Sequence, residues 1–192
     1  MAGQRNFIPR EQTETLIEMI YEQYIPKTEL QKFSDNLKVI CTKLDIKPAW
    51  LLQVMYMESR LRPDIENTAF PFKDGYATGL IQFIPSTARS LGTTTAALKA
   101  LTRVEQLDYV LKYFEPFAGK MKSFYDVYLV VFFPAAINQP NDYVFETKWL
   151  KRSQIASQNP AIDLNKDGKI TMTEFKEYCR KGIPLSVQSE VL

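Results

Sequence analysis

Apolar residues recur at helical spacing along most of the chain, and no alternating pattern is long enough to predict a strand. Residues 13–25 and residues 33–46 each carry an apolar stripe on one face, which predicts two amphipathic helices. A third helix is predicted to begin at Pro48, where a missing N–H costs nothing in the first turn, and to end before Pro63. These segments predict an all-α fold.

Shorter elements are predicted in the middle of the chain. Residues 63–79 are rich in Asn, Pro, Asp and Gly and are expected to form a loop, followed by short helices around residues 86–91 and 95–101. Thr102 and Glu105 have the spacing of a capping box, in which each side chain bonds the other residue's free backbone N–H. A further helix is therefore predicted to start there.

The last part of the chain divides into an apolar and a polar stretch. Residues 123–137 are apolar all round and belong in the core, as helix or as strand, with an interruption at Pro134. The chain is polar after this stretch. We therefore expect an N-terminal helical segment over residues 1–32 that packs on the core, a main domain over residues 33–150, and a C-terminal segment over residues 151–192.

The most informative feature of the composition is a missing residue type, because it limits which catalytic mechanisms are open to the protein. The chain has no histidine, which excludes Ser-His-Asp and Cys-His catalysis together with histidine-bound zinc. Acid–base chemistry must then come from carboxylates, Tyr, Lys or Cys. Cys41 and Cys179 fit no Cys-x-x-Cys spacing and are interpreted as buried thiols. The net charge of +2 is scattered, so no nucleic-acid partner is expected.

The start of the chain bears on where the protein acts. Residues 1–16 lack the apolar stretch of a signal peptide, and no run is long enough to span a membrane. We expect a protein made in the cytoplasm, without membrane insertion. A target outside the cell would require another protein to provide passage.

Glu58 is the first candidate for catalysis. Residues 50–57 leave almost no polar face, and Glu58 follows them in the last turn of the helix. The helix dipole and any burial both disfavour a charged carboxylate there, which is the condition for a general acid in glycosidic cleavage. The alternative is a solvent-facing Glu58 paired with Arg60 or Arg62.

A Gly-Leu-Ile-Gln turn some twenty residues later favours the catalytic interpretation. Gly79 permits a backbone conformation or a close approach that a side chain would block. Gln82 supplies a donor and an acceptor that suit an acetamido or hydroxyl group. The Gly-x-x-Gln spacing alone is a weak signal, but together with Glu58 and Ser59 it forms a pattern.

This pattern resembles a known enzyme family. The segments "WLLQVMYMESRLRP" and "ATGLIQFIPSTARSLG", and more loosely "EQLDYVLKYF" and "DVYLVVFFPAAI", are similar to the soluble lytic transglycosylases, relatives of goose-type lysozyme, especially those of bacteriophages. The resemblance spans about residues 33–138. It implies an all-α, lysozyme-like domain that cuts the β-1,4 bond between N-acetylmuramic acid and N-acetylglucosamine in peptidoglycan.

The resemblance also assigns roles to individual residues. It makes Glu58 the single catalytic acid and base and gives Ser59 an orienting role. The wall beside the reacting sugar would be formed by Gly79, Leu80, Ile81 and Gln82, with Ile81 in place of the family's Met.

A third motif of the family, Ala-Tyr-Asn, is altered here. The chain has Val131, Phe132 and Phe133 at the corresponding place, so Phe132 would keep the aromatic wall without the hydroxyl that contacts the acid. We expect Tyr128 or Tyr125 to substitute for that hydroxyl.

The reaction implied by the resemblance needs only one carboxylate. Attack by the sugar's own C6 hydroxyl would produce a 1,6-anhydro end, whereas attack by water would make the enzyme a lysozyme. Asp64, Glu66 and Asp74 lie in the intervening loop, where they would either orient such a water or remain solvated. Both outcomes stay open, as does a weakly active structural virion protein with the same fold.

A separate motif near the C-terminus predicts a calcium site. The segment "DLNKDGKITMTE" fits the twelve-residue EF-hand loop, which selects Ca²⁺ through hard oxygen ligands. The expected ligands are Asp163, Asn165, Asp167, the Lys169 carbonyl, Thr171 and Glu174. The alternative is a degenerate loop held by Lys166 and Lys169. We expect calcium to be structural and the glycosidic chemistry to need no cofactor.

The expected partner is the glycan strand of peptidoglycan. Without a signal peptide, two routes to the cell wall fit the sequence: release through a holin at lysis, or carriage on a phage particle, where virion components would be partners.

Overall fold

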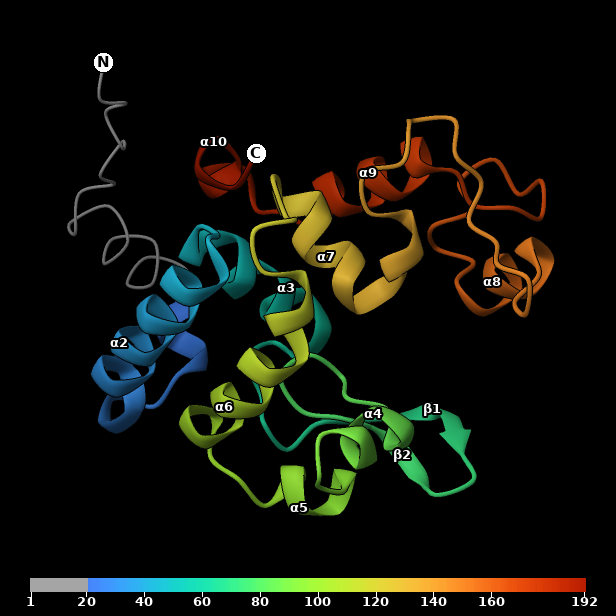
Figure 1. The fold of residues 1–192 in the computed structure, drawn as a ribbon. Helices are drawn as coiled ribbons and strands as arrows, with labels where there is room; N and C mark the ends of the chain where they lie inside the picture. Colours follow the sequence, from blue (N-terminus) through green and yellow to red (C-terminus); the bar gives the residue numbers. More distant parts are fainter. Residues whose placement is uncertain (1–20) are drawn as a thin grey trace. The chain divides into compact units, whose positions relative to one another are not determined.

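In the computed structural model, the described residues are 21–192, and most of them are helical (Figure 1). The expected all-α class is confirmed, and the small two-stranded sheet is consistent with a lysozyme-like domain. Residues 13–20 of the first predicted helix lie outside the described part. Within that part, no helix combines the length and the apolar character needed to cross a bilayer.

The chain falls into two compact units that meet in sequence between Ala118 and Gly119. The boundaries expected at residues 32/33 and 150/151 differ from this division, which groups residues 119–150 with the C-terminal segment. They stay a prediction. We call residues 1–118 unit 1 and residues 119–192 unit 2, and describe each by itself.

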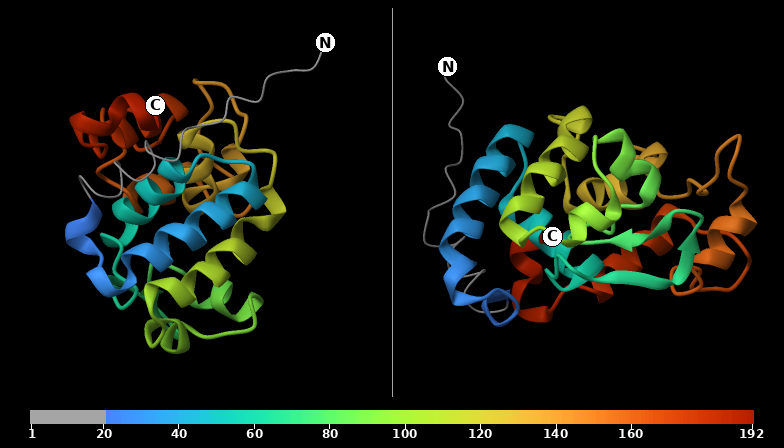
Figure 2. Two further views of the ribbon diagram at one scale, coloured as in Figure 1. Left: turned by 90° about the vertical axis from the view of Figure 1, so that its left-hand side faces the viewer. Right: turned by 90° about the horizontal axis from the view of Figure 1, so that it is seen from below.

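The helices of unit 1 surround the segment that carries Glu58. Its elements are η2 (Glu22–Tyr24), α2 (Lys27–Leu44), α3 (Pro48–Ser59), β1 (Glu66–Phe72), β2 (Gly75–Thr78), α4 (Pro85–Ser90), α5 (Thr95–Lys99), α6 (Arg103–Phe114) and η3 (Glu115–Phe117). Helix α2 lies along α6 and also packs against α3 (Figure 2). The buried stripe of α2 includes Phe33, Leu37 and Leu44, as its hydrophobic spacing predicts.

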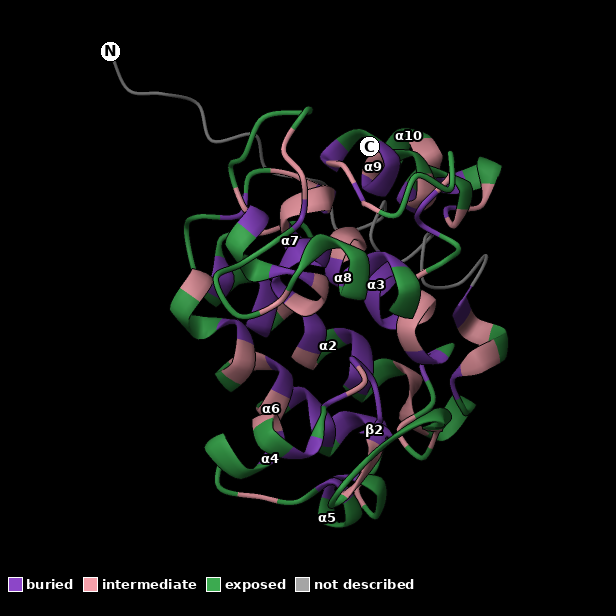
Figure 3. Ribbon diagram, turned by 90° about the vertical axis from the view of Figure 1, so that its right-hand side faces the viewer, coloured by how far each residue is buried: buried purple, intermediate pink, exposed green. Residues whose placement is uncertain are grey.

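Helix α3 is the central element of unit 1. It begins at Pro48, with Lys47 as N-cap, and its middle residues from Leu51 to Met55 are all buried (Figure 3). It ends at Ser59 because Arg60 and Leu61 both take left-handed backbone conformations, with φ of 54° and 60°. The predicted helix is therefore confirmed, with its end a few residues before Pro63.

The segment expected to be a loop contains a β-hairpin. Strand β1 pairs antiparallel with β2 across a two-residue turn, with Phe72 opposite Gly75 and Glu66 opposite Thr78. Nearly all of β1 is exposed on both faces (Figure 3). Such a strand leaves no alternation of apolar and polar residues in the sequence, which explains why the pattern predicted only a loop.

Unit 2 contains the apolar stretch and the predicted calcium loop. Its elements are α7 (Phe124–Phe132), η4 (Pro134–Ala136), α8 (Arg152–Gln158), α9 (Met172–Lys181), η5 (Leu185–Val187) and α10 (Gln188–Val191). The apolar stretch is thus a helix, capped by Ser123, whose hydroxyl accepts the N–H of Asp126. It stops before Pro134, as the sequence predicts.

An aromatic cluster forms the core of unit 2. The ring of Phe175 on α9 stacks on Phe132, with ring centres 5.3 Å apart, and contacts Tyr128 and Phe145. Phe133 stacks in turn on Phe145 at 5.1 Å. Aromatic pairs at these distances stabilise a core beyond the area that they bury.

Candidate functional site

Glu58 lies in the last turn of α3, where the sequence places it, and its side chain is half-buried. The two arginines proposed as alternative partners have other contacts. Arg62 forms an ion pair with Asp64 at 3.2 Å, and the guanidinium of Arg60 lies 4.3 Å from the ring centre of Tyr56. These contacts leave both interpretations of Glu58 open.

Ser59 joins the end of α3 to the Gly79–Gln82 turn. Its hydroxyl lies 2.9 Å from the Met55 carbonyl oxygen and 3.1 Å from the carbonyl oxygen of Leu80, and the side chain is buried. Since the two motifs are far apart in sequence, this contact shows that the fold brings the end of α3 and the turn together. The orienting role expected for Ser59 stays a prediction.

The turn itself depends on two residues with positive φ. Gly79 has φ of 79° and Gln82 has φ of 54°. The turn is closed by a bond from the Gln82 N–H to the Gly79 carbonyl at 3.1 Å. The side-chain amide of Gln82 donates to the same carbonyl at 3.0 Å. Leu80 and Ile81 are buried, so the turn is a rigid, partly internal feature.

Gln106 on α6 holds the turn from the other side, and the sequence analysis did not identify it. Its side chain is fully buried, and its Oε1 atom accepts the Leu80 N–H at 3.0 Å. Its Nε2 atom donates to the carbonyls of Pro63 at 2.6 Å and Leu98 at 2.7 Å. The available signal was a glutamine on the buried stripe of an amphipathic helix, beside Leu107.

Tyr113, also on α6, is a second residue that the sequence analysis missed. Its ring contacts Phe83, with ring centres 6.2 Å apart. Burial raises the pKa of the Tyr113 phenol, and the nearby charge of Glu58 raises it further. A tyrosine hydroxyl therefore lies within electrostatic range of Glu58, on an element for which the sequence expected no such role.

The two aromatic residues expected beside Glu58 belong to unit 2. Tyr128 is buried among Phe124 and Phe175, and Phe132 packs on Phe145 and Phe175. Their contact with substrate stays a prediction.

The acidic residues between the two motifs all have cationic partners. The pairs are Asp64 with Arg62 at 3.2 Å, Glu66 with Lys99 at 2.5 Å, and Asp74 with Arg89 at 2.7 Å. The hydrogen bond from Arg62 lowers the pKa of Asp64. These three carboxylates are thus engaged in the hairpin and its neighbours, mostly at the surface.

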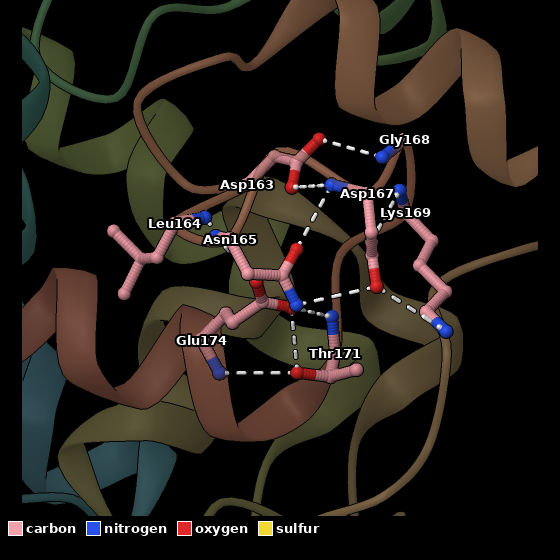
Figure 4. Close-up of polar contacts among 8 residues, drawn as sticks. All are labelled: Asp163, Leu164, Asn165, Asp167, Gly168, Lys169, Thr171 and Glu174. Carbon is pink, nitrogen blue, oxygen red and sulfur yellow. Dashed lines mark hydrogen bonds and ion pairs between the residues drawn. The ribbon is translucent and has the colours of Figure 1, made fainter.

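The predicted calcium loop has a closed network of hydrogen bonds (Figure 4). Asp163 accepts the N–H groups of Asp167 at 3.2 Å and Gly168 at 3.0 Å. Asn165 accepts the Asp167 N–H at 2.9 Å, and Asp167 accepts the Lys169 N–H at 3.2 Å. The loop therefore turns its side-chain oxygens toward its own backbone, with Gly168 at φ of 80°.

Glu174 closes this loop from helix α9. One of its oxygens accepts the N–H groups of Leu164 at 3.2 Å and Asn165 at 3.4 Å, and the other accepts the Thr171 N–H at 2.9 Å and the Thr171 hydroxyl at 2.7 Å (Figure 4). Thr171 caps α9 in a capping box with Glu174. A short strand-like contact, from the Phe145 N–H to the Ile170 carbonyl at 2.9 Å, flanks the loop.

The loop's chemistry suits a hard cation. All six expected ligands present oxygen, the donor type that Ca²⁺ prefers, and Asp163 and Glu174 are nearly buried. Among residues 21–192, no three His, Cys, Asp or Glu side chains converge as a metal site. The Lys169 ammonium pairs with Asp167 at 3.3 Å, a contact that the degenerate-loop alternative expects.

Comparison with known proteins identifies a domain within unit 1. Residues 36–112 match the family model of the transglycosylase SLT domain. The matched span contains Glu58, the Gly79–Gln82 turn and Gln106, and it covers fewer than half of the residues of the chain. At the level of the family, the match supports peptidoglycan cleavage of the transglycosylase type. No curated protein and no solved structure matches the chain.

Proposed function

We propose, from the transglycosylase SLT match over residues 36–112, that this protein is a peptidoglycan lytic transglycosylase with Glu58 as its single catalytic acid and base. The bond cleaved would be the β-1,4 bond from N-acetylmuramic acid to N-acetylglucosamine. The observation that carries the proposal is the 3.1 Å contact from the Ser59 hydroxyl to the Leu80 carbonyl, because it unites the residue beside Glu58 with the second motif.

The proposed reaction uses one carboxyl group twice, first as an acid and then as a base. Glu58 donates its proton to the leaving glycosidic oxygen as the C1–O bond breaks, and the acetamido oxygen of the same muramic acid bonds to C1. The C6 hydroxyl oxygen then attacks C1, displaces the acetamido oxygen and gives its proton to the Glu58 carboxylate. The product is a 1,6-anhydro end, no water is consumed, and Glu58 is restored to its protonated form.

The hydrolytic alternative needs a group that orients water. Asp64, Glu66 and Asp74 were the candidates, and each of them pairs with a lysine or arginine. A lysozyme would use the same Glu58, so the two reactions differ only in what attacks C1.

The test is to treat purified peptidoglycan with the protein and identify the released fragments by mass spectrometry. We expect anhydro ends from the wild type and none from Glu58→Gln. Glu66→Gln is the matched control, since it removes a nearby carboxylate outside the proposed chemistry, and should keep most of the activity. Reducing ends would support the lysozyme alternative, and no fragments from the wild type would favour a structural protein of the same fold.

We also propose that the enzyme acts in phage-mediated degradation of the cell wall. The sequence resemblance to phage-type members supports this setting. Mass spectrometry of purified particles and of cleared lysates from an infected culture would test it: recovery in either fraction supports a phage role, and the fraction distinguishes a particle component from a released enzyme. Recovery only from uninfected cells would contradict it.

For unit 2, we propose a structural Ca²⁺ site in the loop from Asp163 to Glu174. The expected ligands fit because each offers an oxygen, and calcium would hold the loop to the start of α9 without taking part in cleavage. Calorimetric titration with Ca²⁺ should show one site in the wild type and none in Asp163→Ala. Asp142→Ala, an exposed acid outside the loop, is the control. Equal binding by all three proteins would eliminate the site.

A further inference from the structure

The backbone of Leu80 is held on both sides by buried side chains. Its N–H donates to Gln106 Oε1 at 3.0 Å, and its carbonyl accepts the Ser59 hydroxyl at 3.1 Å. Ser59 is the residue next to Glu58. An unbroken series of contacts therefore runs from α6, through the middle of the Gly79–Gln82 turn, to the end of α3.

Gln106 is unusual in the number of segments that it joins. Both N–H groups of its amide reach carbonyls outside α6, on Pro63 before the hairpin and on Leu98 in α5, while its oxygen takes the Leu80 N–H. A glutamine amide has two donors, and both are used here. The side chain has no exposure to solvent, so water does not compete for these bonds.

The absence of a side chain at Gly79 leaves room for the Gln106 amide. A Cβ atom at Gly79 would lie 2.4 Å from Gln106 Oε1 and 3.0 Å from the amide carbon and nitrogen. The amide thus occupies the space that a side chain at residue 79 would need. The glycine of the motif is required here by Gln106 as well as by its own φ of 79°.

We propose that Gln106 is a positioning residue for catalysis, because its amide fixes where the Gly79–Gln82 turn lies relative to Glu58. The inference deepens the proposed function and rests on it. Displacements of about 1 Å at a reacting group can cost about 100-fold in rate, so a turn released from α6 would impair cleavage without any change in the groups that contact the sugar.

The test compares two variants of neighbouring residues on α6. Gln106→Met keeps the length of the side chain and removes all three hydrogen bonds, whereas Val110→Ala removes buried methyl groups on the same helix and no side-chain hydrogen bond. Rates of muropeptide release are measured at saturating substrate, well below the melting temperatures of both. We expect a loss of about 10- to 100-fold for Gln106→Met, and little change for Val110→Ala.

Gln106→Glu distinguishes the hydrogen bond that Gln106 accepts from the Leu80 N–H from the two that it donates to Pro63 and Leu98. A carboxyl oxygen still accepts the Leu80 N–H, so this variant should retain more activity than Gln106→Met, and it serves as the test if Gln106→Met does not fold. Hydrogen exchange provides a readout without catalysis: the Leu80 N–H should exchange faster in Gln106→Met than in Val110→Ala.

Two results would overturn the inference. One is a rate for Gln106→Met equal to that of Val110→Ala, and the other is unchanged exchange at Leu80. Failure of the proposed function is recognised separately, because it appears as an inactive wild type before any variant of Gln106 is compared.

Discussion

The charge of Glu58, on α3, acts on the phenol of Tyr113, on α6. Burial raises the pKa of the Tyr113 phenol, and the Glu58 charge adds to the rise because a second negative charge beside it is unfavourable. Tyr113 is thus a tyrosine of unit 1 on whose pKa the charge of Glu58 acts. Its effect should be visible in the pH dependence of stability.

We predict that Tyr113→Phe reduces the loss of stability at alkaline pH. The folded protein holds the Tyr113 proton more tightly than the unfolded chain, whose tyrosines titrate near pH 10. Stability is therefore unaffected by this group below pH ~10 and falls as pH rises above it, because only the unfolded state releases the proton readily. Melting temperatures of wild type and variant should therefore converge or cross as the pH rises above about 10. A difference in melting temperature that stays constant over this pH range would contradict the prediction.

Gly79 allows a second prediction, because the chain contains a matched glycine. Gly92 has φ of 77°, close to the 79° of Gly79, but a Cβ there would meet nothing within 4 Å. Both alanine variants carry the left-handed backbone cost of about 1–2 kcal/mol. Gly79→Ala should lose more stability than Gly92→Ala in urea unfolding, since it also collides with Gln106. Equal losses would show that the Gln106 amide moves aside freely.

Helix α6 is the element that connects the separate parts of the site. Its first turn is fixed by Thr102 and Glu105, which bond each other's backbone N–H in the predicted capping box. The bonds from the Thr102 N–H and hydroxyl lower the pKa of Glu105. Gln106 follows directly, and Tyr113 lies two turns further along the helix. The cap therefore sets the position at which the helix presents both side chains.

We predict that Thr102→Ala lowers the free energy of unfolding by about 1 kcal/mol, the usual value of a lost N-cap. Thr102→Ser keeps the hydroxyl, so its free energy of unfolding should be close to that of the wild type.

The pKa of Glu105 is lower in the folded protein than in the unfolded chain, where it is about 4.3. The stability that Glu105 contributes is therefore present above about pH 4.3 and is lost as pH falls below it. Urea unfolding at neutral pH and at pH ~3 would measure this, and equal stability of all three proteins at neutral pH would contradict it.

The whole molecule combines two compact units with different proposed roles. Unit 1 carries the transglycosylase match and Glu58, and unit 2 carries the predicted calcium loop. A ligand that binds only the folded form stabilises the unit to which it binds. Calcium should therefore affect the stability of unit 2, whether or not that change reaches the catalytic groups.

We predict that Ca²⁺ at about 100 times its dissociation constant raises the free energy of unfolding by about 2.7 kcal/mol. Calorimetric melting in calcium and in chelator would show the difference for the wild type, and Asp163→Ala should show none. If the two units melt separately, only one transition should move. A chelator effect of equal size in Asp163→Ala would assign the stabilisation to another part of the chain.

Local patterns predicted the features that depend on near neighbours in sequence. The helical fold, the start of α3 at Pro48, the position of Glu58 and the capping box at Thr102 all follow from spacing and side-chain type, and the structure confirms them. The exposed hairpin did not follow, because a strand without a buried face has no periodic signature.

The sequence by itself determined that this protein is helical, that its acid–base chemistry cannot use histidine, and that Glu58 with the Gly79–Gln82 turn is its candidate site. Only the tertiary structure decided which residues support that site. Gln106 and Tyr113 look like ordinary members of an amphipathic helix in the sequence. The hydrogen bond of Gln106 to Leu80 and the electrostatic effect of Glu58 on Tyr113 appear only in the folded chain. Such contacts join segments more than twenty residues apart, and pairings at that distance depend on how the helices pack.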